Sequence, residues 1–252
     1  MFELLKLRKN HGFPVIADLR RAEIIPEFRG FPLLSDKQCP GGCRSCPEIC
    51  PTGAITTEPL RLDLGKCIFC GECARNCPAQ AIRFSSAYCL GATDRARLVV
   101  SAGQTEADFH GQAIVTRKEI KRLFGRSLKL RQVSAAGCNG CEMELAACGN
   151  VNFDMGRFGI DFVASPRHAD GIVFTGPISR NMAPALQDAY QSISEPRLVI
   201  AVGACAISGG IFADSRELNR CFLEKVPVDL YVPGCPPHPL TFIHSILDFL
   251  GQ

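Results

Sequence analysis

The stretch Cys67–Pro78, CIFCGECARNCP, carries four cysteines at the spacing C-x2-C-x2-C-x3-C-P. Its second half recurs earlier in the chain, because Cys46–Ile55 (CPEICPTGAI) matches Cys73–Ile82 (CARNCPAQAI) at a distance of 27 residues. Cys43 matches Cys70 in the same register, whereas Cys39 lies one residue before the position that matches Cys67. Self-similarity of this kind indicates two copies of one small structural unit.

The duplicated spacing suits a pair of iron–sulfur clusters. Three thiolates two residues apart surround one cluster, and the fourth cysteine, which precedes a proline, ligates the other cluster. The spacing assigns one 4Fe-4S cluster to Cys39, Cys43, Cys46 and Cys77, and a second to Cys67, Cys70, Cys73 and Cys50. Structural zinc also uses C-x2-C pairs, but it explains neither the prolines nor the duplication. Residues 28–90 therefore resemble the bacterial two-cluster ferredoxins.

The composition agrees with metal binding in a reducing compartment. The chain has 252 residues, of which 46% are hydrophobic and fifteen are cysteines. Disulfide scaffolds are usually short secreted domains, and the charged residues among the first ten leave no room for the apolar core of a secretion signal. No apolar run approaches the length of a membrane helix. We expect a cytoplasmic protein, and the net charge of +3 gives no reason to expect a nucleic-acid partner.

From about residue 129 the pattern changes to short apolar strands that alternate with helices. The predicted strands are Leu128–Val133, Gly159–Ala164, Gly171–Thr175, Arg197–Val202 and Pro227–Val232. Helical spacing is found in Asn181–Ser192 and Pro239–Leu250, with Met182, Ala185, Leu186 and Ala189 on one face of the first. Alternation of this kind predicts a parallel α/β sheet.

Four further cysteines follow the predicted strands. Cys138 and Cys141 come after the first, Cys205 after the fourth and Cys235 after the fifth. Open α/β sheets place their sites at the carboxyl ends of strands, and glycines beside each cysteine leave room for a cluster near the backbone. The pattern predicts a third 4Fe-4S cluster on these cysteines. Buried core cysteines are the alternative, and would be preferred for any one of the four alone.

The same segments resemble a known family. Gly137–Glu144 (GCNGCEME), Ser165–Asp170 (SPRHAD), Gly203–Gly210 (GACAISGG) and Pro233–Pro237 (PGCPP) are similar to the small subunit of nickel–iron hydrogenases of the energy-conserving formate hydrogenlyase type. That subunit is related to the 20 kDa cluster subunit of respiratory complex I, whose first two ligands are adjacent cysteines. Here Asn139 and Gly140 separate them, which favours the hydrogenase branch.

The resemblance implies an architecture and a function. The expected fold is a parallel flavodoxin-like sheet domain at 129–252, preceded by a small α+β two-cluster ferredoxin domain at 1–90 and by a linker with a basic helix at 91–128. It implies an electron-transfer subunit of a membrane-associated complex, peripheral on the inner face of the membrane. The implied partners are a nickel–iron large subunit, membrane subunits, and formate dehydrogenase or another donor. A complex-I-like quinone or ferredoxin oxidoreductase subunit without hydrogenase activity is the alternative.

For several residues outside the three cysteine sets, the sequence leaves two possible roles open. Glu142 follows Cys141 at the start of a predicted helix, where it either serves the helix dipole or passes protons near the large subunit. Arg167 and His168 either tune the potential of the third cluster or form a surface salt bridge. The remaining cysteines are predicted to be small core residues: Cys89, Cys148 and Cys221.

Two further segments leave alternatives open. Arg117–Arg131 contains seven lysines and arginines and one acidic residue, as expected for a solvated helix face or for a surface that docks an acidic neighbour. The apolar residues of Met1–Lys9 fit either a core helix or a segment that seats on a membrane subunit.

Overall fold

The computed structural model describes residues 2–35 and 43–252. Its N-terminal elements are short: α1 (Phe2–His11), η1 (Leu19–Arg21), β1 (Pro32–Leu34), α2 (Ser45–Ile49), β2 (Ile55–Thr57), β3 (Leu60–Asp63), α3 (Glu72–Arg75) and β4 (Ile82–Phe84). The middle of the chain contains η2 (Arg95–Leu98), β5 (Val99–Ser101), α4 (Glu106–Ala113) and α5 (Lys118–Phe124). The rest alternates strands and helices: β6 (Leu128–Ser134), α6 (Gly140–Ala147), η3 (Met155–Phe158), β7 (Ile160–Phe162), η4 (Pro166–His168), β8 (Gly171–Thr175), α7 (Ala183–Gln191), β9 (Leu198–Val202), α8 (Ala204–Ser208), η5 (Gly210–Phe212), α9 (Cys221–Lys225), β10 (Leu230–Val232) and α10 (Pro239–Leu250).

The C-terminal half is built on a five-stranded sheet in the order β10-β9-β8-β6-β7, in which every pair is parallel. Numbered along this half of the chain, the order is 2-1-3-4-5, the flavodoxin-like arrangement. The predicted parallel α/β fold is confirmed. In this order the connections reverse direction between β6 and β8, and open α/β sheets bind ligands beyond the carboxyl ends of the strands at this point.

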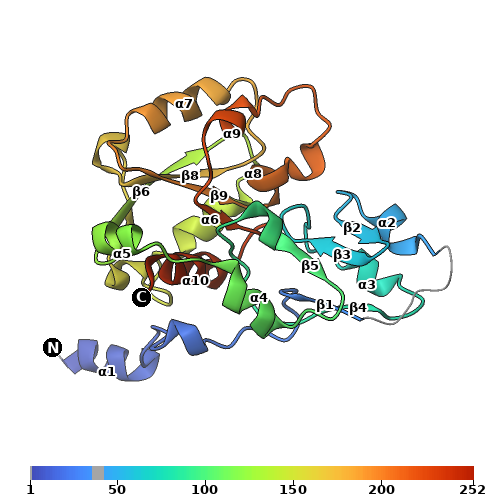
Figure 1. The fold of residues 1–252 in the computed structure, drawn as a ribbon. Coiled ribbons are helices and arrows are strands. Elements are labelled where there is room, and N and C mark those ends of the chain that lie inside the picture. The colour runs from blue at the N-terminus through green and yellow to red at the C-terminus, as the bar shows by residue number, and fades with distance from the viewer. Residues whose placement is uncertain (1, 36–42) are drawn as a thin grey trace.

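Helices cover both faces of this sheet, with α7 and α9 on one side and α5 and α10 on the other (Figure 1). The strands bury alternate residues in two cores, because successive side chains of a strand point to opposite faces. In β8, Ile172 and Phe174 belong to the core that includes Leu186 of α7, while Val173 packs with α10. Strands buried on both faces read as continuous apolar runs, which explains why the predicted and observed bounds of β8 agree.

Helix α7 corrects one detail of the predicted pattern. Leu186 is buried, and Met182, Ala189 and Tyr190 are partly buried against the same core. Ala185, predicted to lie on this face, is exposed. The observed stripe runs through positions i, i+4, i+7 and i+8 from Met182, and Ala185 lies to one side of it.

The N-terminal half forms two small antiparallel sheets, one of β1 and β4 and one in the order β2-β3-β5. Strand β5 lies within 91–128, the stretch expected to be a linker, and its Val100 pairs with Leu62 of β3. This stretch therefore contributes a strand to the cysteine-rich half. Where one domain ends and the next begins stays a prediction.

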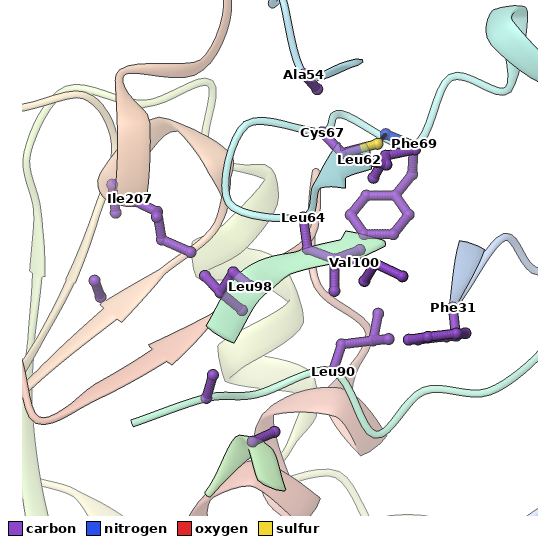
Figure 2. Close-up of a cluster of buried hydrophobic side chains, with 14 of the residues drawn as sticks. Phe31, Ala54, Leu62, Leu64, Cys67, Phe69, Leu90, Leu98, Val100 and Ile207 are labelled. Atoms are coloured by element: carbon purple, nitrogen blue, oxygen red, sulfur yellow. Dashed lines mark hydrogen bonds between the residues drawn. The ribbon is translucent and has the colours of Figure 1, made fainter. Parts of the chain in front are cut away.

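One hydrophobic core runs through both halves of the chain. Figure 2 shows Leu62, Leu64 and Leu98 of the cysteine-rich half in a cluster with Ile207 of α8. Backbone groups join the halves as well, because Ala92 and Tyr231 exchange N–H···O hydrogen bonds of 3.0 and 2.8 Å. The two cysteine regions are thus held at a fixed separation by shared packing.

Replacing Leu98 with alanine is expected to destabilise the protein substantially. The side chain is fully buried at this junction, and removing a buried leucine typically costs about 2–5 kcal/mol through lost transfer energy and the cavity that remains. Anaerobic chemical denaturation of the full chain measures the change. Leu33→Ala is the control, because Leu33 is 43% exposed, and its loss should cost about 0.5 kcal/mol or less. Equal effects at both positions would contradict a shared core.

Helix α1 has no buried residue, and Phe2 and Leu4 are 81% and 71% exposed. The core-helix interpretation of this segment is therefore wrong for the residues that the structure describes. Among these residues no helix is both long and apolar enough to cross a bilayer.

The basic stretch Arg117–Arg131 makes contacts with other parts of the chain. Arg117 pairs with Asp229, and Lys121 Nζ donates to the Gly251 carbonyl at 2.8 Å. Two of its basic side chains thus bind segments near the C-terminus, and are not part of a purely solvated helix face.

Candidate iron–sulfur sites

The four cysteines predicted to hold the second cluster lie around one small cavity. Cys67 and Cys70 come from the loop after β3, Cys73 lies on α3, and Cys50 caps the C-terminus of α2; all four line the cavity. Burial raises the pKa of the Cys67 thiol to about 12, and the charges of Cys73, Cys50 and Cys70 add to this shift. The structure therefore brings together the four residues that the repeat assigns to one site.

Backbone amides donate to the sulfur atoms of this region. The Ala54 amide lies 3.3 Å from Cys50 Sγ, and the Ala81 amide lies 3.3 Å from Cys77 Sγ. These two contacts are equivalent in the sequence repeat, since each joins the fourth cysteine to the amide four residues later. Amides directed at sulfur stabilise a thiolate ligand and affect the potential of a bound cluster.

The first predicted site is described in part. Cys39 lies outside the described residues, and Cys43, Cys46 and Cys77 lie within them. Cys46 and Cys77 are buried in the same core, and the charge of Cys46 contributes to the raised pKa of Cys73 after burial and the charges of Cys70 and Cys50. Helix α2, which carries Cys46, packs on α3. The assignment of four ligands to this site stays a prediction.

The third predicted site lies at the carboxyl end of the parallel sheet. Cys138 and Cys141 follow β6, Cys205 lies in α8 directly after β9, and Cys235 follows β10. Burial is the main cause that raises the pKa of Cys141; the charge of Glu142 raises it further, as do those of Cys205, Cys235 and Cys138. Burial likewise raises the pKa of Cys205 to about 11. Four thiols from three segments thus lie close together at the edge of the sheet, beside the point between β6 and β8 where the connections reverse direction.

Glycine is required at two backbone positions beside these sulfur atoms. A Cβ on Gly203 would lie 2.6 Å from Cys141 Sγ, and one on Gly210 would lie 2.9 Å from Cys205 Sγ. Gly203 has φ 89° and ψ 156°, a conformation that is essentially restricted to glycine. The backbone therefore passes close to the sulfur atoms, as expected where a loop surrounds a cluster.

The donor set suits an iron–sulfur cluster. Four thiolates in a half-buried site would repel one another, and a cationic iron–sulfur core offsets this repulsion. Among the described residues, no three His, Cys, Asp or Glu side chains are grouped as ligands of a single metal ion. A four-iron cluster holds its thiolates farther apart than one ion does, so this finding is compatible with the proposed ligand sets.

The second and third predicted sites lie close together. Cys70 and Cys235 line the same pocket, together with Phe69, Pro236 and His238. The charge of Cys70 also contributes to the raised pKa of Cys235, after burial and the charge of Cys138. No sequence pattern indicates which N-terminal cysteine faces the sheet domain. The packing identifies Cys70 as one that does.

Glu142 lies in the first turn of α6, and its Oε1 accepts a hydrogen bond of 2.7 Å from the Thr175 hydroxyl at the end of β8. Thr175 is fully buried, so this contact fixes α6 to the sheet beside Cys141. Glu142 thus lies where a carboxylate interacts favourably with the helix dipole, as predicted. A part for Glu142 in proton transfer stays a prediction. Arg167 and His168 are exposed on η4, so a part for either in tuning a cluster stays a prediction.

The remaining cysteines divide into two kinds. Cys148 is fully buried and Cys89 is partly buried against the same core, as predicted. Cys221 is exposed at the start of α9, so its prediction as a core residue is wrong. Its neighbours Phe222 and Val226 fill the core instead.

Sequence reasoning missed Arg220. Its guanidinium donates to the carbonyl oxygens of Cys205 at 3.0 Å and of Ala206 at 2.8 Å, both in α8. No motif marks this residue, because its partners are backbone atoms fourteen and fifteen positions earlier. Only the fold brings them together.

Comparison with known proteins identifies two matching families. Residues 138–249 match the family model of the NADH ubiquinone oxidoreductase 20 kDa subunit, and residues 60–83 match the 4Fe-4S binding domain. The first match contains Cys138, Cys141, Cys205 and Cys235. The second contains the motif that starts at Cys67.

Three relatives illustrate the range of this similarity. The probable membrane-bound hydrogenase subunit mbhJ of Pyrococcus furiosus is 36% identical over 129 residues, which are 51% of this chain and 77% of that protein. Formate hydrogenlyase subunit 7 of Escherichia coli is 46% identical over 135 residues, covering 53% of this chain and 51% of that protein. An NADH-quinone oxidoreductase subunit of Heliobacterium modesticaldum is 40% identical over 154 residues, covering 61% of this chain and 87% of that protein. The chain therefore belongs to the family of the NADH ubiquinone oxidoreductase 20 kDa subunit, a family of oxidoreductase subunits, and it carries a 4Fe-4S binding domain in the same polypeptide.

Proposed function

We propose that this chain is the electron-transfer small subunit of a membrane-associated nickel–iron hydrogenase complex of the formate hydrogenlyase type. It holds three 4Fe-4S clusters on the twelve assigned cysteines and relays electrons to the active site of a separate large subunit. The observation that carries this proposal is the shared pocket of Cys70 and Cys235, because it brings a cysteine assigned to the second cluster close to one assigned to the third.

The residues of the chain bind, separate and insulate the clusters. When bound, a 4Fe-4S cluster supplies one-electron transfer at a potential set by its surroundings. Cys67, Cys73 and Cys46 are buried, and the shared core fixes the distance between the cysteine sets. The amides of Ala54 and Ala81 hold two of the sulfur atoms in place.

The proposal extends to partners and location. The partners are a nickel–iron large subunit, membrane subunits of the complex, and formate dehydrogenase or another electron donor. The chain lies on the cytoplasmic face of the membrane and is attached through partner subunits. Support comes from the names of two relatives, a membrane-bound hydrogenase subunit and a formate hydrogenlyase subunit.

Anaerobically purified protein is expected to be brown and to contain about twelve iron atoms and twelve acid-labile sulfides per chain. The complex isolated with its native partners is expected to reduce protons to hydrogen when a strong reductant supplies the electrons. Metal analysis and a hydrogen assay measure the two quantities. Colourless protein that contains zinc instead of iron would overturn the cluster assignment.

A complex-I-like quinone or ferredoxin oxidoreductase subunit is the second candidate. It is favoured by the description of the matching family and by the 40% identity to the Heliobacterium modesticaldum protein. The partner large subunit discriminates between the two. Two C-x2-C pairs for nickel, with hydrogen evolution, support the hydrogenase, whereas their absence together with quinone or ferredoxin turnover supports the alternative.

A further inference from the structure

Arg220 is held rigidly beside the third site by backbone carbonyl groups. Nη1 donates to Pro177 O at 3.1 Å and to Cys205 O at 3.0 Å. Nη2 donates to Ala206 O at 2.8 Å and to Ile207 O at 3.1 Å. Four acceptors fix the orientation of the guanidinium, and three of them belong to α8, the helix that carries Cys205.

The charge of this arginine has no acidic partner among residues 2–35 and 43–252. Several other arginines pair with carboxylates, as Arg95 does with Asp63 at 2.6 Å and Arg20 does with Asp248 at 2.9 Å. Arg220 is about half-buried, and burial lowers its pKa while the negative charge of Cys205 opposes that shift. A guanidinium stays protonated in proteins, so a positive charge remains at this position.

Such a charge has a defined effect on a redox centre beside it. A four-thiolate cluster is an anion that gains a further negative charge on reduction, and net charge is one of the factors that set its potential. A nearby cation stabilises the reduced form more than the oxidised form, because the Coulomb energy grows with the charge of its partner. The effect is larger in a half-buried site than in water.

We propose that Arg220 is a positioning residue that raises the reduction potential of the third cluster by holding an uncompensated positive charge beside Cys205. The inference rests on the proposed function, since it requires a cluster at this site. It assigns to Arg220 the tuning role that the sequence suggests for Arg167 and His168, both of which are exposed.

The alternative is that Arg220 only closes the end of α8. Potential measurements on Arg220→Gln and Arg220→Lys, made on the full chain purified anaerobically, distinguish the two. The third cluster is identified by paramagnetic resonance as the signal that is lost in Cys205→Ser. Arg197→Gln is the matched control, because Arg197 also donates to two helix-end carbonyls, those of Tyr190 at 3.1 Å and Ile193 at 2.9 Å, but pairs with Glu195.

Arg220→Gln should lower the potential of the third cluster alone, with a roughly tenfold change in its reduced-to-oxidised ratio at fixed potential, or about 59 mV for one electron. Arg220→Lys and Arg197→Gln should keep the wild-type value. Loss of the cluster in the glutamine variant but not in the lysine variant also supports the role of the charge. An unchanged potential in Arg220→Gln, equal shifts in both variants, or loss of the cluster in both overturns it. Absence of a third signal in the wild-type protein contradicts the proposed function instead.

Discussion

Replacing Cys205 with serine is expected to abolish the 4Fe-4S signal of the third site and to leave the signals of the other two sites unchanged. Iron in these clusters is held by thiolates, and a serine hydroxyl is a much weaker ligand because it ionises far less readily than a thiol. Cys205 lies with the other three predicted ligands at the end of the sheet, whereas the N-terminal cysteines occupy separate loops. Iron analysis should show a loss of about one to four atoms per chain, and paramagnetic resonance should show which signal disappears.

Cys148→Ser is the control for this substitution. Cys148 is fully buried, and its Sγ donates to the Glu144 carbonyl at 3.3 Å, a bond that a serine hydroxyl can also make. We expect this variant to retain all its iron. A Cys205→Ser protein with full iron content and three unchanged signals would show that Cys205 is not a ligand.

Replacing Gly203 with alanine is expected to prevent assembly of the third cluster in most molecules, although no ligand is changed. The new Cβ would lie 2.6 Å from Cys141 Sγ, a distance that forces the sulfur or the loop to move. The backbone conformation adds a strain of about 1–3 kcal/mol for any residue other than glycine. Iron content and the third signal measure the loss.

Gly103→Ala separates the steric effect from the backbone strain. Gly103 also has a positive φ, of 79°, but a Cβ there would meet no atom within 4 Å. This variant should lose about 1–2 kcal/mol of stability and keep its iron. If both glycine variants keep the third cluster, the contact with Cys141 does not limit the space for it.

The parallel sheet could be predicted from the sequence because its strands are buried on both faces. The predicted bounds of β8 and α10 agree with the observed ones, and the strand ends then place four cysteines at one edge of the sheet. The N-terminal sites follow from a spacing that needs no tertiary information. The structure supports this logic most directly for Cys50, which joins three cysteines from the other half of the repeat around one cavity.

Other features depend on contacts between distant parts of the chain, which no local pattern encodes. β5 is only three residues long, and its place beside β3 is decided by backbone pairing across almost forty positions. Cys221 is exposed although its surroundings are apolar, because its neighbours Phe222 and Val226 face the core. Arg220 escapes sequence reasoning for the same reason, since its partners are backbone carbonyls rather than side chains.

The paired hydrogen bonds between Ala92 and Tyr231 protect the outer strand of the parallel sheet. An unpaired strand edge is a template for association with other chains, and natural proteins cover or interrupt such edges. Here the segment that connects the two cysteine regions lies along β10 and occupies backbone groups at its middle residue. The segment that connects the two cysteine regions thus also leaves fewer backbone groups of β10 open to pairing with a strand of another chain.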